Sequence, residues 1–283
     1  MWGILENFHE GWYHSSTLKN IAMLLGQYLS PMLGFLVLGG LSIRWPRIGA
    51  VLHVLLSIFA LRFFTNSLAA QSLIVTPLLL LAVLYFFATF QGKLAPLVVL
   101  VGCPVVTLIG FGLEPAIRVA SRIDDGQLGT HCTQYKDQEL IWAPIGPGWP
   151  TSGTSWHSAK DVCSRLELDG KTLSEQPLNI WRLPTPAEIV AAQYRANQPC
   201  NGVYDERTQT ASYQTRPDKE TPMWNPRSQV IYMWTAEEID DSTALMIVYD
   251  GKLWPRPKDA RWGYLGFRAV RTATEQESGR EPE

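Results

Sequence analysis

Charged side chains are scarce in the first 113 residues of this sequence. That stretch contains five Lys or Arg residues and two acidic residues, so its net charge is +3. The remaining 170 residues contain 19 basic and 24 acidic residues, which gives a net charge of −5. This contrast indicates that the two parts of the chain meet different solvents, and it excludes one uniform soluble domain. The acidic second part also argues against nucleic-acid binding, which requires a clustered basic surface.

Long uncharged runs account for the imbalance. Ile21 to Ile43, Phe63 to Gly92 and Leu94 to Leu113 have no charged residue, and about 20 apolar residues cross the hydrocarbon core as a helix. Ile48 to Leu61 is shorter and precedes Arg62, whose long side chain can reach the interface. The alternative for this shorter run is a re-entrant or interfacial segment. We expect an all-α bundle of about four transmembrane helices in residues 20–113, with spans near 20–42, 48–65, 71–90 and 94–113.

Nothing at the N-terminus has the pattern of a cleaved signal peptide. The first apolar run is too long for the core of such a peptide, and a polar tail of residues 1–19 precedes it. Interfacial placement of this tail is favoured by its aromatic residues, which are Trp2, Phe8, Trp12 and Tyr13. A metal site formed by His9, Glu10 and His14 is the less favoured interpretation.

Ionisable residues are almost absent from the expected spans. His53 is the only titratable residue near the middle of a span, and no span contains an acidic residue. An ionisable residue within a membrane is a functional candidate by default, but a proton relay needs a partner group. We therefore expect His53 to pack between helices or to hydrogen-bond there.

The charges in the loops favour one orientation in the membrane. Ser42–Arg47 and Lys93 fall in the two short loops on one side, which the positive-inside rule places in the cytoplasm. Lys19, Arg118 and Arg122 favour the opposite orientation, so both stay open. We prefer the first, in which a multi-pass protein of a bacterial inner or plasma membrane carries its C-terminal part outside the cytoplasm.

The second part has the pattern of one α+β domain at residues 130–272, after a linker at 114–129 and before a disordered tail at 273–283. Trp156 to Leu168 is apolar on one helical face and can be capped by Thr154 or Ser155. Thr185, Pro186 and Glu188 predict a capping box that starts a second helix. Strands are expected at Glu139–Trp142, Gln229–Thr235, Ala244–Tyr249 and Leu265–Arg271.

Two kinds of residue in this domain are candidates for ligand binding. Arg182 lies in an extended segment, where we expect an ion pair with a carboxylate such as Glu188 or Glu237, the alternative being a ligand anchor. Eight tryptophans fall in this part, and those on predicted elements are assigned to the core: Trp142, Trp156, Trp181 and Trp234. The tryptophans predicted in loops can stack on a ligand such as a sugar, and they are Trp224, Trp254 and Trp262.

Cysteines are few. Cys132, Cys163 and Cys200 in the second part fit one disulfide and one buried thiol in an oxidising compartment, with three pairings open. Because Cys163 lies on the apolar face of a predicted helix, we favour a disulfide between Cys132 and Cys200.

Cofactor motifs are missing from the sequence. There is no P-loop, dinucleotide fingerprint, Gly-x-Ser-x-Gly or zinc-ligand spacing, and we expect no cofactor. Calcium is a minor alternative, because a group of acidic residues could supply oxygen ligands but lacks the spacing of a calcium loop. We interpret these residues as solvated turn charges: Glu237, Glu238, Asp240, Asp241 and Asp250.

A resemblance rests on an ordered series of short motifs across about residues 130–272. The series is Asp137-x-Glu-Leu-x-Trp142, Trp156-x-x-Ala159, Trp181-Arg182-Leu183-Pro184-Thr185 with Glu188, Tyr232-x-Trp234-Thr235, Asp250-Gly251 and Phe267-Arg268-Ala-Val-Arg271. It resembles the bacterial domain of unknown function at the C-terminus of the Lcl collagen-like adhesin. That domain is similar to the sulfatase-modifying-factor, or formylglycine-generating enzyme, superfamily. The resemblance implies a C-type-lectin-like α+β fold.

The resemblance does not imply an active enzyme. Formylglycine-generating enzymes hold copper with a cysteine pair near the end of the domain, and this chain has no cysteine after Cys200. Iron-dependent relatives need several histidines, and this domain has His131 and His157. Adhesin-type relatives imply binding, including to sulfated polysaccharides, for which a net charge of −5 is a poor match.

The preferred hypothesis is a membrane-anchored, non-enzymatic module that binds a ligand or protein as a sensor or adhesin. Its partners would be the lipid bilayer and a glycan or protein ligand, with no nucleic acid. One alternative is a diverged enzyme of the sulfatase-modifying superfamily. The other is a small transporter or membrane assembly factor, for which His53 would matter. The sequence contains no feature that specifies an oligomeric state.

Overall fold

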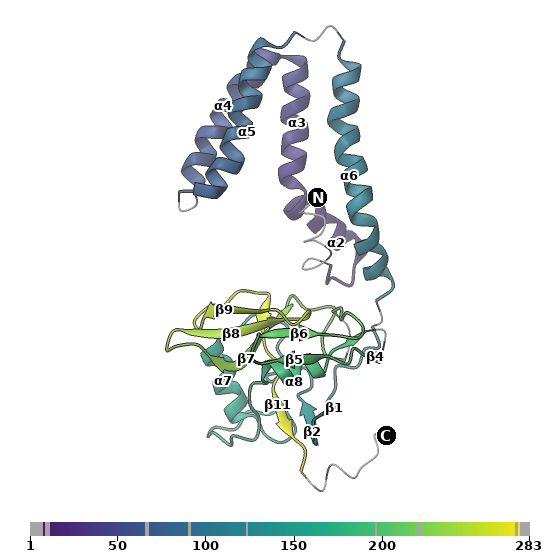
Figure 1. The fold of residues 1–283 in the computed structure, drawn as a ribbon, viewed down its shortest axis with the longest axis vertical. Helices are drawn as coiled ribbons and strands as arrows, with labels where there is room; N and C mark the ends of the chain where they lie inside the picture. The colour runs from purple at the N-terminus through teal and green to yellow at the C-terminus, as the bar shows by residue number, and fades with distance from the viewer. Residues whose placement is uncertain are drawn as a thin grey trace. The chain divides into compact units, whose positions relative to one another are not determined.

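The structure is a computed structural model that describes residues 8, 12–65, 68–89, 92–122, 124–195, 197–219, 222–274 and 277. The chain divides into two compact units (Figure 1). We call them the membrane unit, built on Leu18–Ile117, and the C-terminal unit, built on Arg118–Glu283. Most of the tails predicted for residues 1–19 and 273–283 lies outside the described residues.

Helices form the membrane unit. In chain order they are α2 (Thr17–Met23), the π-helix η2 (Leu24–Tyr28), α3 (Ser30–Arg44), α4 (Pro46–Phe63), α5 (Leu68–Phe87) and α6 (Leu94–Ala120). Two of them, α4 and α6, are long and apolar enough to cross a membrane. Thr17–Tyr28 and Ser30–Arg44 make a third span only if this pair, bent by 61°, is counted as one.

The structure thus supports two or three spans in the described residues, fewer than the four predicted. The first expected span is broken at Leu29, and Pro31 lies in the first turn of α3, where its missing N–H costs no helical hydrogen bond. Helix α5 also contains an apolar stretch, Gln71–Phe87. Periodicity and apolar length do not reveal the break at Leu29, because uncharged residues continue through it.

Small side chains let α4 pack closely against its neighbours. Its buried residues include Gly49, His53 and Ser57, and a methyl group added to Gly49 would lie 2.2 Å from Oγ of Ser42 on α3. His53 is 2% exposed, its Nδ1 lies 2.8 Å from the Gly49 carbonyl, and its ring centroid is 5.2 Å from that of Tyr85 on α5. The expected packing role of His53 is confirmed, and the small-residue face is typical of helix contacts in membranes.

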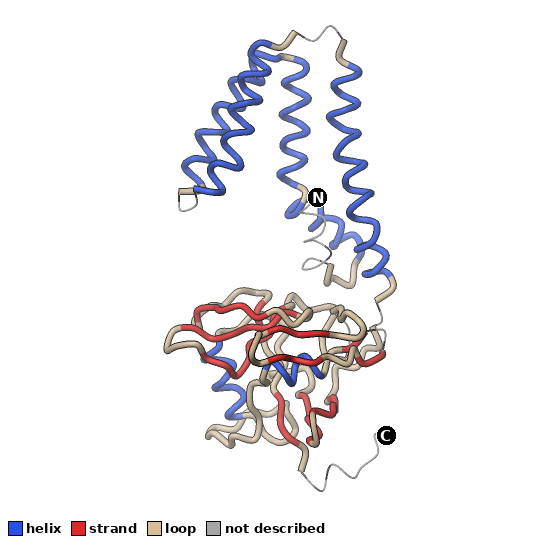
Figure 2. The backbone as a smooth tube through the Cα atoms, in the orientation of Figure 1, coloured by secondary structure: helices blue, strands red, loops and turns tan. Residues whose placement is uncertain are grey.

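The C-terminal unit is rich in β-structure, with loops joining most of its strands (Figure 2). One antiparallel sheet has the order β1-β2-β11, with β1 at His131–Tyr135, β2 at Gln138–Trp142 and β11 at Val270–Thr272. A second has the order β10-β7-β8-β9, with β7 at Tyr232–Glu238, β8 at Thr243–Val248, β9 at Leu253–Pro257 and β10 at Leu265–Gly266. Two small hairpins pair β3 (Tyr194–Arg195) with β4 (Gln198–Pro199) and β5 (Val203–Asp205) with β6 (Thr210–Ser212).

Two short helices accompany these sheets. Helix α7 spans Trp156–Arg165, and Ser155 caps it by accepting a bond from the Ser158 amide. Helix α8 spans Pro186–Ala191 and begins with the predicted capping box, in which Thr185 and Glu188 bond each other's amides. The four tryptophans assigned to the core are each at most 3% exposed: Trp142, Trp156, Trp181 and Trp234.

One segment that was predicted to be a single strand forms two strands in the structure. Leu265–Arg271 was expected to be continuous, but β10 pairs with β7 and β11 pairs with β2, in different sheets. Between them Arg268 turns fully inward and donates to the carbonyls of Ala143, Pro222 and Gly129. The hydrogen bonds from Arg268 to three loops interrupt the strand between β10 and β11. The alternation of side chains in the sequence does not reveal this interruption.

Candidate functional site

Strand β9 and the loop after it bring together Trp254 and Trp262, two of the tryptophans predicted to contact a ligand. In the register with β8, Trp254 lies opposite Met246 and Arg256 lies opposite Ala244. Because alternate residues of a strand share a face, Trp254 and Arg256 point to the same side of the sheet. The guanidinium carbon of Arg256 lies 5.3 Å from the ring centroid of Trp254 and 5.5 Å from that of Trp262.

Tyrosines support the two indoles. The ring of Tyr264 stacks on Trp262 at 5.7 Å, and Tyr232 meets Trp254 edge-on at 5.9 Å and Tyr264 at 5.4 Å. We call these four residues, together with Arg256, the aromatic patch. Trp254 and Trp262 keep 39% and 38% of their surface exposed, whereas Tyr232 is buried. Exposed indoles held by a rigid base are typical of binding surfaces.

The Arg256 side chain is partly buried. Its Nη1 donates to the Pro255 carbonyl at 3.0 Å, and its Nε is buried with no hydrogen-bond partner among the described residues. Cation–π attraction to two rings favours this position, at about 0.5–1 kcal/mol for each contact in a partly exposed site. The patch therefore offers two indole faces with one positive charge between them.

Prolines restrict what can bind at the neighbouring sheet edge. The Lys258 amide donates to the Ser242 carbonyl, and the Val248 amide donates to the Lys252 carbonyl. The backbone N–H and C=O groups of the even-numbered residues in 252–258 therefore point towards β8. The nitrogens of Pro255 and Pro257 then face the open edge, where neither can donate a hydrogen bond. A partner strand could not pair fully along β9, and recognition there falls to side chains.

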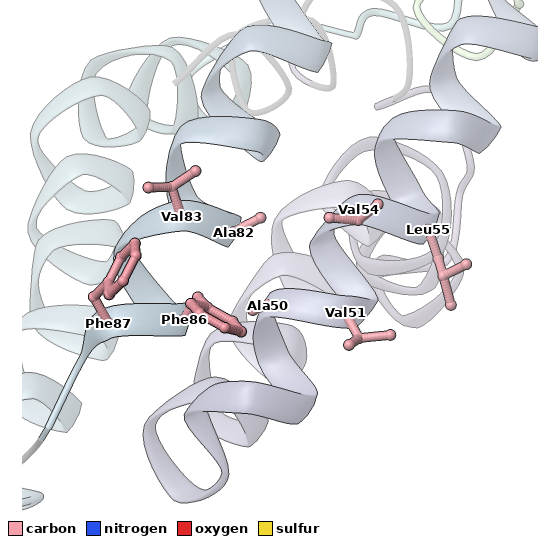
Figure 3. Close-up of a pocket in the computed structure, with 8 residues that line it drawn as sticks. All are labelled: Ala50, Val51, Val54, Leu55, Ala82, Val83, Phe86 and Phe87. Atoms are coloured by element: carbon pink, nitrogen blue, oxygen red, sulfur yellow. The ribbon is translucent and has the colours of Figure 1, made fainter.

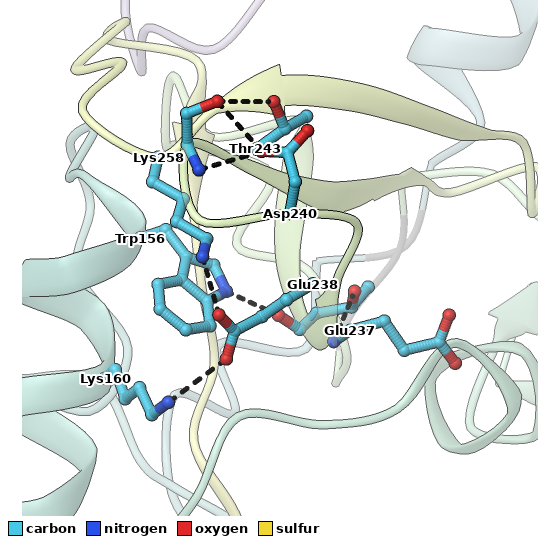
Figure 4. A network of polar contacts seen from close by, with 9 residues as sticks. Trp156, Lys160, Glu237, Glu238, Asp240, Thr243 and Lys258 are labelled. Carbon is cyan, nitrogen blue, oxygen red and sulfur yellow. Dashed lines mark hydrogen bonds and ion pairs between the residues drawn. The ribbon is translucent and has the colours of Figure 1, made fainter.

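A separate network of polar contacts centres on Glu238 (Figure 4). Nζ of Lys258 donates to Glu238 at 2.6 Å and Nζ of Lys160 donates at 3.3 Å, and both ammonium groups lie within 5 Å of the Trp156 ring centroid. The bond from Lys258, followed by that from Lys160, holds the pKa of Glu238 below its ordinary value. Glu238 therefore neutralises two lysines, which occupies the oxygens that a calcium ion would need.

Two of the other acidic residues considered for calcium, Asp240 and Asp250, are also engaged locally. Asp240 accepts from the Ser242 amide and hydroxyl, and Asp250 pairs with Lys252 at 3.1 Å. Across the part of the chain that the structure describes, no three His, Cys, Asp or Glu residues are grouped to hold a metal ion.

Arg182 lies apart from the aromatic patch, beside a cavity of about 220 Å³ between α7 and the Trp181–Leu183 segment. It donates to both Glu188 oxygens, at 2.8 and 2.6 Å, which confirms the expected ion pair. Burial strongly raises the pKa of the Cys163 thiol on the cavity wall, so this thiol is protonated at neutral pH. The cavity has no activated nucleophile in Cys163, and its arginine is already paired.

Trp224 is placed differently from the prediction. It is 1% exposed, and its Nε1 donates to the Gln193 side chain at 3.0 Å. It belongs to the core although it lies outside any helix or strand, so it offers no face to a ligand. Position in a loop does not reveal exposure when the loop itself is buried.

The favoured disulfide is absent. All four cysteines, which lie in described segments, are thiols: Cys132 on β1 is exposed, whereas Cys163 and Cys200 are buried. The apolar helix face predicted for Cys163 is confirmed at 2% exposure. Cys200 is enclosed where its amide donates to Gln193, and Cys132 pairs through its backbone with Ile141.

Sequence reasoning missed Arg256, Tyr232 and Tyr264. The only sequence signal was the alternation Trp254-Pro-Arg256-Pro, which places an aromatic and a cation on one face if the segment is a strand. No protein-family model matches the sequence, and neither does any curated protein.

Proposed function

We propose that the protein is a membrane-anchored, non-enzymatic binding module whose C-terminal unit recognises its ligand at the aromatic patch. The observation that carries this is the Arg256 guanidinium between the half-exposed rings of Trp254 and Trp262. Tryptophan and arginine dominate the energetics of many binding surfaces because they offer large apolar area together with directional donors.

The arrangement of the C-terminal unit supports a C-type-lectin-like fold of the Lcl C-terminal family. Its first strands and its last strand share one sheet, as β2 pairs with both β1 and β11. Two short helices and a separate twisted sheet complete it. The Trp181–Thr185 motif contributes a buried ring, an ion-paired arginine and a helix cap. In this proposal the helices of the membrane unit act as an anchor of about four spans, and the C-terminal unit is extracytoplasmic.

The chemistry of the patch favours a saccharide as ligand. Indole faces stack on the C–H faces of pyranose rings, and a guanidinium donates to hydroxyl or carboxylate oxygens. One arginine can accommodate a neutral or singly acidic sugar. A polyanionic chain is a poorer ligand, because the surrounding unit is acidic and long-range repulsion would oppose it. A protein ligand is the competing outcome of the test.

The test uses the full chain in detergent, titrated with oligosaccharides selected on a glycan array. We expect Trp254→Ala and Trp262→Ala each to weaken binding at least tenfold, since each removes a stacking face. Ile180→Ala is the matched control, because Ile180 is 38% exposed in the same unit but outside the patch. Equal affinity of all three variants would contradict the proposal, and binding of a protein but of no sugar would replace its ligand class.

Orientation is tested separately with reporter fusions after Thr274. An active extracytoplasmic reporter is expected. Activity of a cytoplasmic reporter would contradict the extracytoplasmic placement while leaving the binding surface itself to the titration.

A further inference from the structure

Two cavities of the membrane unit adjoin each other on the α4–α5 helix pair. The first, of about 330 Å³, lies between these helices and is lined only by apolar residues, among them Ala50, Val54 and Ala82 (Figure 3). The second, of about 750 Å³, lies at the α3–α4 turn and is lined by Arg44, Trp45 and Arg47 among others. Phe86 and Phe87 line both cavities, so the two spaces adjoin at these rings.

The first, apolar cavity results from the packing of α4 against α5. Ala50 on α4 and Ala82 on α5 are 5% and 4% exposed, and their short side chains leave a groove between the two helices. Larger side chains stand at the rim, where Val51 and Val83 are more than half exposed. The rings of Phe86 and Phe87 meet edge-on at 5.2 Å at the boundary between the groove and the second cavity. The groove suits a flexible hydrocarbon chain.

The second cavity carries positive charge from two arginines. Arg44 and Arg47 are exposed, and neither forms an ion pair with a carboxylate in the described part of the chain. The guanidinium of Arg44 lies 5.8 Å from the ring centroid of Trp45, which is 49% exposed. The sequence has no acidic residue between Glu10 and Glu114, so these helices cannot neutralise the two arginines themselves. Both arginines therefore remain open to an anion from outside these helices.

We propose that these two adjoining cavities together bind one anionic phospholipid. Its phosphate would pair with Arg44 and Arg47, its glycerol region would lie at Trp45, and one acyl chain would occupy the groove beside Ala50 and Ala82. Arginine and tryptophan at a helix end are suited to the headgroup level, and basic pockets between membrane helices select anionic headgroups. Free phosphate would use the arginines but gain nothing from the apolar groove, which is why we assign the site to a lipid.

The test compares lipids bound by the full chain. The protein is purified in detergent and exchanged into equimolar phosphatidylglycerol and phosphatidylcholine, and the retained lipid is counted by native mass spectrometry. We expect one phosphatidylglycerol to be retained at least tenfold in preference to phosphatidylcholine. Inorganic phosphate at millimolar concentration should not displace it. Equal retention of both lipids, or displacement by phosphate, would overturn the proposal.

Three variants locate the effect. The double variant Arg44→Gln/Arg47→Gln should lose the preference, and Val51→Trp, which fills the groove from its exposed rim, should reduce retention of both lipids. Arg62→Gln is the matched control, because Arg62 is an arginine near the opposite end of the same helix α4. Circular dichroism of each variant establishes that it is folded. A folded double variant that still prefers phosphatidylglycerol, or an equal loss in Arg62→Gln, would refute the site.

Discussion

The guanidinium of Arg268 lies 3.7 Å from the ring centroid of Trp149, and both side chains are buried. Arg268 also donates at 2.7 Å to Ala143 and at 3.1 Å to Gly129, and it donates to Pro222. No carboxylate is among these partners. Burial lowers the pKa of Arg268 to about 9, which reflects the cost of holding its charge away from water. Carbonyl oxygens and one indole face offset that cost and fasten three loops together.

Arg268→Lys is therefore expected to destabilise the C-terminal unit. Lysine has no planar fork, so at least two buried carbonyls lose their donor, at an expected cost of about 2–4 kcal/mol. Urea unfolding of the full chain in detergent, followed by tryptophan fluorescence, measures this. Arg227→Lys is the control, because Arg227 is 55% exposed and pairs with Asp124 on the surface, where less than about 0.5 kcal/mol is expected. Equal effects of the two variants would contradict the structural role of Arg268.

Protonation of Glu188 at low pH should destabilise the C-terminal unit. Burial alone would raise the pKa of Glu188, but hydrogen bonds from Arg182 and Thr185 outweigh it and hold this pKa below its ordinary value. A lowered pKa in the folded state means that the stabilisation is complete above the unfolded pKa of about 4.3. It is lost as the pH falls through the folded value, because protonation breaks the pair.

Glu188→Gln should thus cost about 1–2 kcal/mol at pH 7, a range that allows for the 44% exposure of the Arg182 side chain. The difference from the wild type should shrink as the pH falls below about 4. Unfolding free energies at pH 7 and pH 3 measure it. Asp161→Asn removes a surface carboxylate paired with Arg165 and should show little change at either pH. A deficit in Glu188→Gln that is the same at both pH values would contradict this account.

Local signals in the sequence predicted much of the C-terminal unit. Thr185 and Glu188 predict a helix start because the capping box involves only four consecutive residues. Trp142, Trp156 and Trp234 were assigned to the core because they lie on periodic segments. These features depend on neighbours in the chain, which the sequence shows directly.

Features that depend on distant partners were not predictable. Strand β9 escaped prediction because Pro255 and Pro257 argue against a strand, and only its place at the edge of the sheet makes them compatible. Burial of Trp224 depends on Gln193, 31 residues earlier in the chain. For the site, two tryptophans were identified, but the arginine that joins them was not, since its position follows from the pairing of β9 with β8.

The two prolines of β9 should keep the protein from associating through this edge. Pro255→Val/Pro257→Thr restores two outward N–H donors on a β-branched strand, and we expect concentration-dependent self-association. Light scattering with size-exclusion chromatography in detergent measures the mass. The matched variant Lys252→Thr, at an exposed position of the same hairpin, should keep the wild-type mass. An unchanged mass in the double variant would show that the prolines do not protect the edge.

Cys132 offers a direct test of the thiol state. The thiol of Cys132 is exposed on β1, whereas Cys163 and Cys200 are buried, so a maleimide should modify Cys132 alone in the folded unit. Partial burial, then the nearby Glu139 carboxylate, raise the pKa of Cys132, so labelling should be slow at pH 7 and faster as the pH rises. A Cys103→Ser background removes the exposed thiol of α6 from the measurement.

Peptide mass spectrometry without reductant identifies the modified residue, and Cys132→Ser should abolish the signal. If Cys132 reacts only after reduction, a disulfide holds it, and Cys200→Ser or Cys163→Ser should then release the thiol and reveal its partner. That result would support the oxidised arrangement expected from the sequence and contradict the three-thiol structure. Reaction of Cys132 without prior reduction would leave the unit to be stabilised by its core, by Arg268 and by the Glu188 pair, without a covalent link.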